Sequence, residues 1–355
     1  MPNKRIVHVV GTGTIGEPLI GLLATFRKEL GIGEVTFHKR TPLLTDRSKV
    51  LSLQQKGAKL AVSREAWEKF SALGMQPAHE ALEAVGRASV VIDCTPVGNE
   101  NKESLYIRYG QNAHGFIAQG SEFGFGKMYA RGINDGALCP GKDQFIQVVS
   151  CNTHNLAVLV DTIALGPEKE DNLEKGSFVC MRRANDLSQE GEFLAAPEAG
   201  KHDDVRFGTH QARDAHHLFK TLGFDLNLYS SAVKLNTQYM HVIHFNLRLR
   251  RNISLEDVIQ RLRSNRRIAF TQKNLSSHVF SFGRDHGIFG RILNQTVIPI
   301  RTLTVKDGRE VIGFSFTPQD GNSLLSSIAA AEWFLYPDEY EKRLRCIEDH
   351  LFQEI

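Results

Sequence analysis

The feature that most constrains this chain lies near its start, where an apolar segment runs directly into a glycine-rich turn. Ile6 to Val10 predicts a buried parallel strand, and an amphipathic helix is expected from near Thr14 to Leu30, ended by Gly31 and Gly33. Between them lies a G-x-G-x-x-G turn, whose glycines allow a tight bend, close approach of a pyrophosphate and close helix packing. The arrangement predicts a dinucleotide site formed by Gly11, Gly13, Thr14, Ile15 and Gly16. The alternative is a glycine-rich turn without a ligand.

The rest of the first 150 residues alternates strand and helix patterns. Glu34 to His38 and Ala88 to Cys94 are expected strands, and helical patterns fill much of Thr45 to Ala84. Strands that alternate with helices form a doubly wound parallel sheet. We therefore expect an α/β chain whose residues 1–150 form a Rossmann-type domain.

The pattern changes after Cys151. A helix is expected around Leu156 to Ile163, and long β-rich stretches follow at Ser177–Arg182, Leu226–Lys234, Tyr239–Leu249, Thr296–Val305 and Glu310–Phe316. The last two flank Lys306-Asp307-Gly308-Arg309, a strong hairpin signal. Residues 151–319 are thus expected to form an α+β catalytic domain with a mixed or antiparallel sheet covered by helices. Helical patterns at Ser323–Phe334 and Asp338–Phe352 predict that residues 320–355 return to the first domain.

The residues after the second strand bear on cofactor choice. An NAD site usually places an Asp or Glu here, about 20 residues after the glycines, to bond the ribose 2′-hydroxyl. This chain instead has His38 followed by Lys39, Arg40 and Thr41. Cationic side chains and a hydroxyl suit a 2′-phosphate, so NADP is favoured and NAD is the second choice. The alternative is an ordinary basic loop, which leaves the cofactor open.

Cys151 is the candidate nucleophile. Residues 145–149 predict a strand that runs into a helix, with the cysteine at the helix N-terminus. The helix dipole and the free N–H groups there favour a thiolate and lower the thiol pKa. The alternative is a small buried residue, which we expect for Cys94, Cys139, Cys180 and Cys346.

Composition excludes several classes of protein. The chain has 355 residues, and 43 basic against 40 acidic side chains give a net charge of +3, which does not mark a nucleic-acid binder. Five scattered cysteines without C-x-x-C spacing indicate reduced thiols and a cytoplasmic location. No run of about 18 apolar residues and no signal-peptide pattern is present, so no membrane association is expected.

Several segments resemble the archaeal-type glyceraldehyde-3-phosphate dehydrogenases, in their usual order. They are Val148–Thr153, Met181–Asp186 and Tyr239–His241, of which the cysteine and double-arginine segments are the most specific. The glycine turn, Asp93-Cys94-Thr95-Pro96 and Val305-Lys306-Asp307 are similar too. The likeness spans most of the chain, although the middle and C-terminal stretches match loosely.

The resemblance implies phosphorylating oxidation of glyceraldehyde 3-phosphate. Cys151, within a catalytic segment that includes Asn152 and Thr153, attacks the aldehyde; His241 takes the proton as hydride leaves, and inorganic phosphate opens the thioester. Arg182 or Arg183 binds the substrate phosphate, with Arg183 slightly favoured. A homotetramer is implied as well. The remaining residues implied by the resemblance are Thr209 and His210 near the anion sites, and Thr95, Pro96, Gln319 and Asn322 near the cofactor.

Two departures from the family keep alternatives open. The family commonly has two adjacent histidines where this chain has Thr209-His210-Gln211, and a small hydroxyl residue where it has His154. Water instead of phosphate therefore remains an acceptor to consider. A semialdehyde or acyl-phosphate dehydrogenase and a catalytically weak NADPH-binding redox sensor are the competing hypotheses. A histidine metal site is discounted, because His241 and His244 point to opposite faces of a strand.

Overall fold

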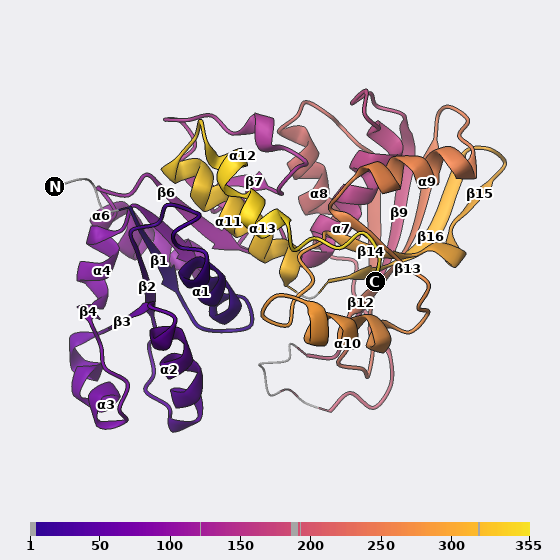
Figure 1. Ribbon diagram of the computed structural model, residues 1–355. Coiled ribbons are helices and arrows are strands. Elements are labelled where there is room, and N and C mark those ends of the chain that lie inside the picture. The colour runs from indigo at the N-terminus through magenta and orange to yellow at the C-terminus, as the bar shows by residue number, and fades with distance from the viewer. Residues whose placement is uncertain (1–4, 121, 186–190, 192, 319) are drawn as a thin grey trace. The chain divides into compact units, whose positions relative to one another are not determined.

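The computed structural model describes residues 5–120, 122–185, 191, 193–318 and 320–355. The chain forms two compact units (Figure 1). The first comprises Met1–Arg131, Leu138–Val148 and Leu324–Asp349, and the second comprises Gly132–Ala137, Val149–Ser323 and His350–Ile355. Each unit is built around one eight-stranded sheet.

The first sheet has the order β4-β3-β2-β1-β5-β6-β8-β7, and its neighbouring strands are paired in parallel. Its central strands are buried Val- and Ile-rich runs, as expected for a sheet covered on both faces. The predicted Rossmann-type sheet is confirmed. Its strands are β1 (Ile6–Val10), β2 (Glu34–His38), β3 (Lys59–Val62), β4 (His79–Glu80), β5 (Val90–Asp93), β6 (Gly115–Gln119), β7 (Lys127–Tyr129) and β8 (Phe145–Val148).

Helices surround this sheet, with α1, α2 and α4 beside β1 to β3 in Figure 1. They are α1 (Gly16–Thr25), η1 (Leu44–Asp46), α2 (Arg47–Gln55), η2 (Arg64–Ala66), α3 (Trp67–Ala72), α4 (Ala81–Arg87), α5 (Gly98–Asn101), η3 (Lys102–Tyr106), α6 (Ile107–Tyr109), α12 (Tyr340–Arg343), α13 (Arg345–Glu348) and most of α11 (Gly321–Leu335).

Several expected boundaries in this unit were wrong. The first helix ends at Thr25 instead of Leu30, and hydrogen-bonded turns complete the segment to Gly31. Strand β3 lies within the stretch expected to be helical. The prediction missed it because periodicity does not distinguish a strand from a helix in so short an apolar run. The expected helix Asp338–Phe352 is reduced to the two single turns α12 and α13.

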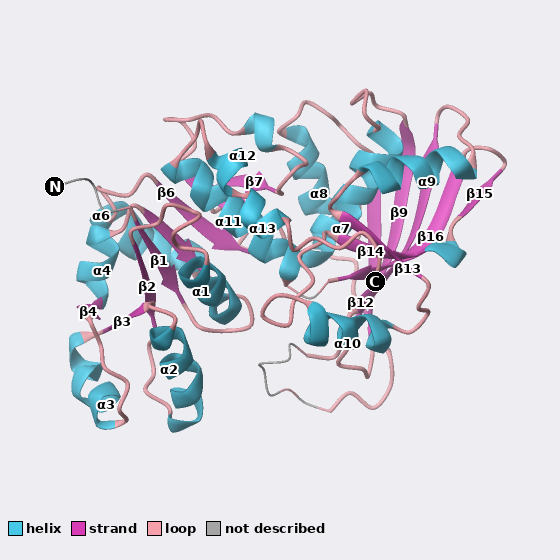
Figure 2. Ribbon diagram, viewed as in Figure 1, coloured by secondary structure: helices cyan, strands magenta, loops and turns pink. Residues whose placement is uncertain are grey.

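The second sheet is mixed, with the order β10-β11-β9-β12-β16-β14-β13 and β15 paired to β16 (Figure 2). Pairs β11·β9 and β13·β14 are parallel, and the other neighbours are antiparallel. The strands are β9 (Leu173–Arg182), β10 (Glu198–Ala199), β11 (Leu228–Lys234), β12 (His241–Leu249), β13 (Ile268–Thr271), β14 (Thr296–Pro299), β15 (Thr304–Lys306) and β16 (Glu310–Thr317).

The predicted hairpin is confirmed between β15 and β16. Asp307 and Gly308 have φ angles of 50° and 68°, the two positive values that a tight two-residue hairpin turn requires. The single strand expected at Thr296–Val305 is interrupted, however. Pro299 has no N–H to donate, and the 3₁₀ turn η6 (Ile300–Thr302) separates β14 from β15.

The helices of this unit begin with α7, which carries Cys151 as its first residue. They are η4 (Asp135–Ala137), α7 (Cys151–Leu159), η5 (Val160–Leu165), α8 (His210–Lys220), α9 (Leu255–Ser264) and α10 (Ser276–His286). Helix α7 is buried along nearly its whole length, since every residue after Cys151 is buried. Helix α7 packs against α8, β12, β14 and β16 of the same unit.

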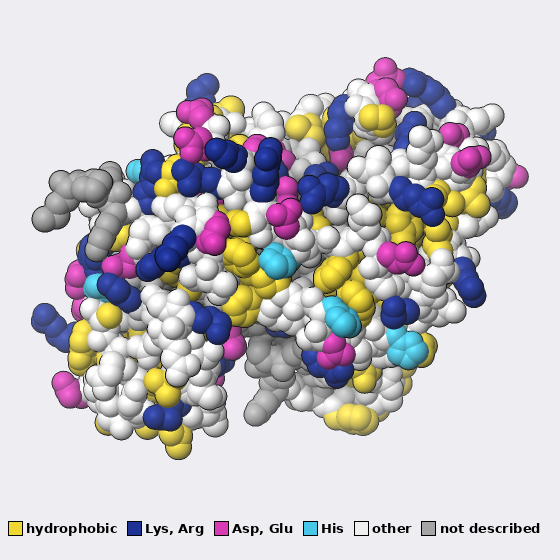
Figure 3. All heavy atoms as spheres, in the orientation of Figure 1, with side chains coloured by type: hydrophobic (Ala, Val, Ile, Leu, Met, Phe, Trp, Pro, Cys, Tyr) yellow, Lys and Arg dark blue, Asp and Glu magenta, His cyan; other side chains and the backbone are white. Residues whose placement is uncertain are grey.

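The face of the molecule drawn in Figure 3 shows no strong charge of one sign. On the face in Figure 3, Lys and Arg side chains are interspersed with Asp and Glu. No helix in the described part of the chain combines the length and apolar character needed to cross a membrane.

His8 is a buried polar side chain at the centre of the first sheet. It lies in β1 opposite Thr36 of β2, and its Nδ1 is 2.7 Å from the Thr36 hydroxyl. Burial, together with the charges of His38 and His79, lowers the pKa of His8 to about 3. Between pH 6.5, the ordinary pKa of histidine, and about pH 3, the ring is therefore mostly neutral in the folded protein and mostly protonated in the unfolded chain.

We predict that His8 contributes to acid destabilisation. The unfolded chain binds a proton at His8 below about pH 6.5 and the folded chain does not, so stability is complete above that pH and falls as pH decreases towards 3. His8→Gln should reduce the loss of unfolding free energy between pH 7 and pH 5 by about 2 kcal/mol. Urea unfolding at both pH values measures this, with the exposed His278→Gln as control. An unchanged pH dependence in His8→Gln would contradict the prediction.

Candidate active site

The glycine turn after β1 has the geometry of a dinucleotide cradle. Gly11 has a φ of +96°, and its N–H donates to the carbonyl of His38 at 3.1 Å. A Cβ at Gly16 would lie 2.2 Å from the Gly11 carbonyl oxygen, so the helix packs this closely only with glycine. A Cβ at Gly13 would meet no atom within 4 Å, which leaves the turn open on that side. The residues therefore fit a bound pyrophosphate at the start of α1.

The turn after β5 lies against this glycine turn. A Cβ at Gly11 would lie 3.2 Å from Cγ2 of Thr95, which brings Thr95 to the predicted cofactor site. The buried Asp93 carboxylate holds this second turn by accepting bonds from the N–H and hydroxyl of Thr95, and from Asn101 and Tyr106. Pro96 is exposed beside it. Sequence reasoning quoted Asp93 without giving it this anchoring role.

The basic segment after β2 is arranged differently from the sequence expectation. Burial lowers the pKa of His38, so this ring is uncharged near neutral pH. Lys39 is buried and donates to the carboxylate of Asp46, whereas Arg40 and Thr41 are exposed. Lys49 lies 2.9 Å from the same carboxylate. Sequence reasoning missed both Asp46 and Lys49, because they lie beyond the loop in which the cations were sought.

In the second unit, Cys151 is the first residue of α7 and is half-buried. Ser150 caps the helix by accepting a bond from the N–H of Thr153. The Cys151 carbonyl accepts a bond from the side chain of Asn322 at 3.0 Å. Cys180, by contrast, is fully buried, and burial raises its pKa to about 12. Of these two thiols, Cys151 is the one placed for chemistry.

A buried hydrogen-bond network joins α7 to strand β16. The Thr317 hydroxyl donates to Oδ1 of Asn152 at 3.0 Å and accepts from Nδ2 of Asn155 at 2.9 Å. The Ser315 hydroxyl donates to Oδ1 of Asn155 at 2.9 Å. We call Asn152, Asn155, Ser315, Thr317 and Asn322 the α7 anchor. Its members are buried, so it fixes the position of Cys151 relative to the sheet.

His241 enters the site from the neighbouring strand. It is the first residue of β12 and pairs in register with Thr317, the central residue of the α7 anchor. The N–H of Arg183 donates to its Nδ1 at 3.2 Å, so a neutral ring carries its proton on Nε2. Burial, followed by the charges of Arg183 and Arg182, lowers the pKa of His241 to about 3. The resting imidazole is therefore neutral.

Arg182, Arg183 and His210 complete a basic cluster with His241. Arg182 is exposed and Arg183 is buried, as expected for neighbours at the end of a strand. Burial and the charges of Arg182 and Arg213 lower the pKa of His210 to about 4. The charge of Arg182 lowers the pKa of both His210 and His241. Cys151 and Arg182 also both affect the pKa of Cys180, the first raising it and the second lowering it.

Other predicted site residues are held inside the fold. The Thr209 hydroxyl bonds Gln211 and Ser230 and secures the start of α8 beneath His210. The Thr153 hydroxyl bonds Ser150, and Nδ1 of His154 lies 3.0 Å from the Ser150 carbonyl. Asn322 supports Cys151 rather than standing exposed in a loop. Gln319 lies outside the described residues.

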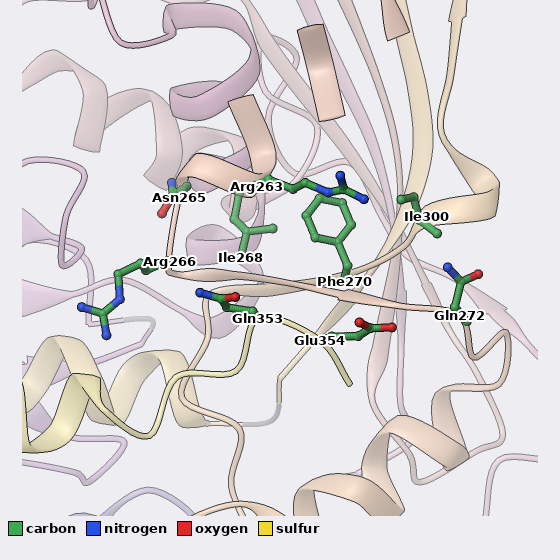
Figure 4. A pocket seen from close by; sticks show the side chains of 9 residues that line it. All are labelled: Arg263, Asn265, Arg266, Ile268, Phe270, Gln272, Ile300, Gln353 and Glu354. Atoms are coloured by element: carbon green, nitrogen blue, oxygen red, sulfur yellow. The ribbon is translucent and has the colours of Figure 1, made fainter. Parts of the chain in front are cut away.

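A cavity of about 410 Å³ lies elsewhere in the second unit, beside β13 (Figure 4). The guanidinium of Arg263 lies 5.9 Å from the centre of the Phe270 ring there, while Arg266 points away from this pair. None of the side chains expected in catalysis lines this cavity. The described residues also include no group of three or more His, Cys, Asp or Glu side chains suited to a metal ion.

Comparison with known proteins identifies relatives along most of the chain, although no family model matches it. It is 28% identical over 340 residues to a glyceraldehyde-3-phosphate dehydrogenase of Methanococcoides burtonii, covering 92% of each chain. The glyceraldehyde-3-phosphate dehydrogenase of Sulfolobus acidocaldarius is 27% identical over 306 residues, 83% of this chain and 82% of the relative. Glyceraldehyde-3-phosphate dehydrogenase 1 of Methanosarcina barkeri is 31% identical, but the match spans only 63% of either chain.

The relatives bear the name that the cysteine, double-arginine and histidine segments already suggested, and the structure brings these segments together in one unit. The fold agrees as well, with a parallel Rossmann-type sheet and a second, mixed sheet. Over most of its length the chain is thus similar to archaeal glyceraldehyde-3-phosphate dehydrogenases.

Proposed function

We propose that this protein catalyses the reversible, NADP-dependent oxidation of glyceraldehyde 3-phosphate to 1,3-bisphosphoglycerate through a thioester on Cys151. The observation that carries the proposal is the α7 anchor, which connects the helix of Cys151 to the strand of His241. The basic cluster beside them suits a phosphorylated substrate. The relatives named glyceraldehyde-3-phosphate dehydrogenase support this choice of aldehyde.

The first step is attack of the Cys151 thiolate on the aldehyde carbon. The helix N-terminus favours the thiolate, and backbone N–H groups at the start of α7 would stabilise the oxygen of the tetrahedral adduct. A carbon–sulfur bond forms as the π bond of the carbonyl breaks, and the aldehyde oxygen takes up the proton that the thiol released and becomes the hydroxyl of a hemithioacetal. Bound NADP supplies the hydride acceptor for the next step.

His241 removes the hemithioacetal proton as the thioester forms. In the resting protein its Nδ1 accepts the Arg183 N–H and the ring proton is on Nε2, so Nε2 can accept the substrate proton only after the ring proton moves to Nδ1 and the bond from Arg183 is released. A substrate phosphate near Arg182 and Arg183 offsets the charges that lower the His241 pKa. Substrate binding thus makes the imidazole a stronger base at the moment when the base is needed.

Phosphate then opens the thioester and releases the acyl phosphate, with the Cys151 thiolate as the leaving group. We assign recognition of the two phosphate groups to the cluster of Arg182, Arg183 and His210. Arg183 is buried and therefore less hydrated than the exposed Arg182, so its guanidinium would bind a phosphate more strongly. The neutral His210 ring offers an N–H donor. Thr209 keeps His210 in place through the bonds at the start of α8.

The cofactor assignment rests on the first unit. The glycine turn accepts the pyrophosphate, and Thr95 closes one side of it. Lys39, Arg40 and Lys49 provide positive charge at the end of β2, where the adenosine ribose of a Rossmann-bound dinucleotide lies. This excess of cations favours NADP over NAD.

The proposal predicts the behaviour of Cys151→Ser. NADPH formation from glyceraldehyde 3-phosphate should require phosphate or arsenate in the wild type and should fall about a thousandfold or more in the variant. NADPH binding, followed by its fluorescence, should be unchanged, and the exposed Cys139→Ser serves as control. Turnover retained in Cys151→Ser would refute the thioester, and lost NADPH binding would show a structural role for the residue.

A second prediction concerns the pKa of His241. Arg182→Gln removes one of the charges that lower it, so this pKa should rise from about 3 towards its ordinary value. The NMR titration of isotopically labelled histidine measures it, with the His241 resonance identified by its loss in His241→Asn. Arg309→Gln, in the exposed hairpin, is the matched control. A His241 pKa that stays constant or falls in Arg182→Gln would contradict the assigned cluster.

A third prediction tests the cofactor. The double variant Lys39→Ala, Arg40→Ala should raise the KM for NADP by about tenfold or more and should change the KM for NAD by less than about twofold. Steady-state kinetics with both cofactors measures the two values. An equal effect on both would refute the assignment of these side chains to the 2′-phosphate.

A further inference from the structure

A carboxylate lies between two lysine side chains at the end of β2. Asp46, the last residue of η1, accepts a bond from Lys39 through Oδ2, and its Oδ1 lies 2.9 Å from Nζ of Lys49. The side chains of Lys39, Asp46 and Lys49 are only 9%, 20% and 23% exposed. We call these three residues the Asp46 clasp. In the clasp, one carboxylate already forms ion pairs with two ammonium groups.

The clasp lies beside the glycine turn. Nζ of Lys49 is 3.5 Å from the carbonyl oxygen of Thr12, within that turn, and 3.8 Å from a carboxylate oxygen of Glu17 in α1. Lys39 approaches from the end of β2. The two ammonium groups therefore span the region between strand and turn where an adenosine ribose and its 2′ substituent are held in this fold.

The charges of the clasp do not cancel. Lys39, Lys49 and the exposed Arg40 outnumber the two carboxylates, Asp46 and Glu17, so a positive excess remains for a further anion. Burial alone would raise the pKa of Asp46, but the hydrogen bonds and charges of Lys39 and Lys49 hold it below its ordinary value. Asp46 is therefore an anion at neutral pH and keeps both ion pairs.

We infer that Asp46 is a cofactor-selectivity residue: an internal counter-ion that competes with the 2′-phosphate of NADP for Lys39 and Lys49, and that accepts a ribose hydroxyl when NAD is bound. This inference rests on the proposed dinucleotide site. A carboxylate and a phosphate that share two ammonium groups repel each other, whereas a neutral amide in the same place does not. Asp46 thus limits the preference for NADP and keeps NAD usable, and Lys49 is the second phosphate-binding cation.

The test measures dissociation constants of NADPH and NADH by nicotinamide fluorescence, because these two molecules differ only in the 2′-phosphate. Asp46→Asn should tighten NADPH about fivefold to tenfold and should leave NADH unchanged or weaker. Lys49→Gln should weaken NADPH by a similar factor and change NADH by less than about twofold. Glu68→Gln and Lys69→Gln, exposed on α3, make the same charge changes away from the clasp and should have no effect.

The outcomes separate this inference from the cofactor proposal. If Asp46→Asn leaves the NADPH/NADH ratio unchanged or lowers it, Asp46 does not compete with the phosphate and the inference is wrong. If Lys49→Gln weakens NADPH and NADH equally, Lys49 is not a 2′-phosphate ligand, which also overturns it. If the Asp46 and Lys49 variants shift the ratio as expected while Lys39→Ala, Arg40→Ala does not, the assignment of Lys39 and Arg40 to the 2′-phosphate fails, and the inference is overturned for Lys39 and upheld for Lys49.

Discussion

The hydroxyl of Thr317, buried between two asparagine side chains of α7, is the interaction on which the active-site geometry depends. It donates to Asn152, accepts from Asn155 and lies on the residue that pairs with His241. Asn322 adds a bond to the Cys151 carbonyl itself. A buried polar network of this kind is costly to break, because each group that loses its partner stays desolvated. The network therefore fixes the position of the helix that begins at Cys151 relative to the strand that begins at His241.

The same physical principle recurs at the cofactor end. Asp93 is buried and satisfied by donors from Thr95, Asn101 and Tyr106, and it holds the turn that lies against the glycine cradle. Asp46 is similarly placed between two lysines. In both sites the residues expected to touch a ligand are oriented by a carboxylate or an amide one layer behind them.

Features set by short-range patterns were predictable from sequence. The strand β1, the glycine turn, the hairpin at Asp307-Gly308 and the placement of Cys151 at a helix N-terminus follow from local periodicity and turn chemistry. What local patterns do not encode is which distant groups meet. The pairing of His241 with Thr317, the bond from Asn322 to Cys151 and the capture of Lys39 by Asp46 all depend on tertiary packing. For the same reason Asn322 was expected in a loop, whereas it is buried in α11 and its side chain bonds the Cys151 carbonyl.

The central claim is that the substrate is carried as a thioester on Cys151. Its most direct test is to mix the protein with NADP and glyceraldehyde 3-phosphate without phosphate, quench in acid, and measure peptide masses. The account predicts a phosphoglyceryl group on the peptide that contains Cys151, formed together with one equivalent of NADPH and lost when phosphate is added before the quench. NADPH formation with Cys151 unmodified throughout, or acylation of another residue, would contradict it.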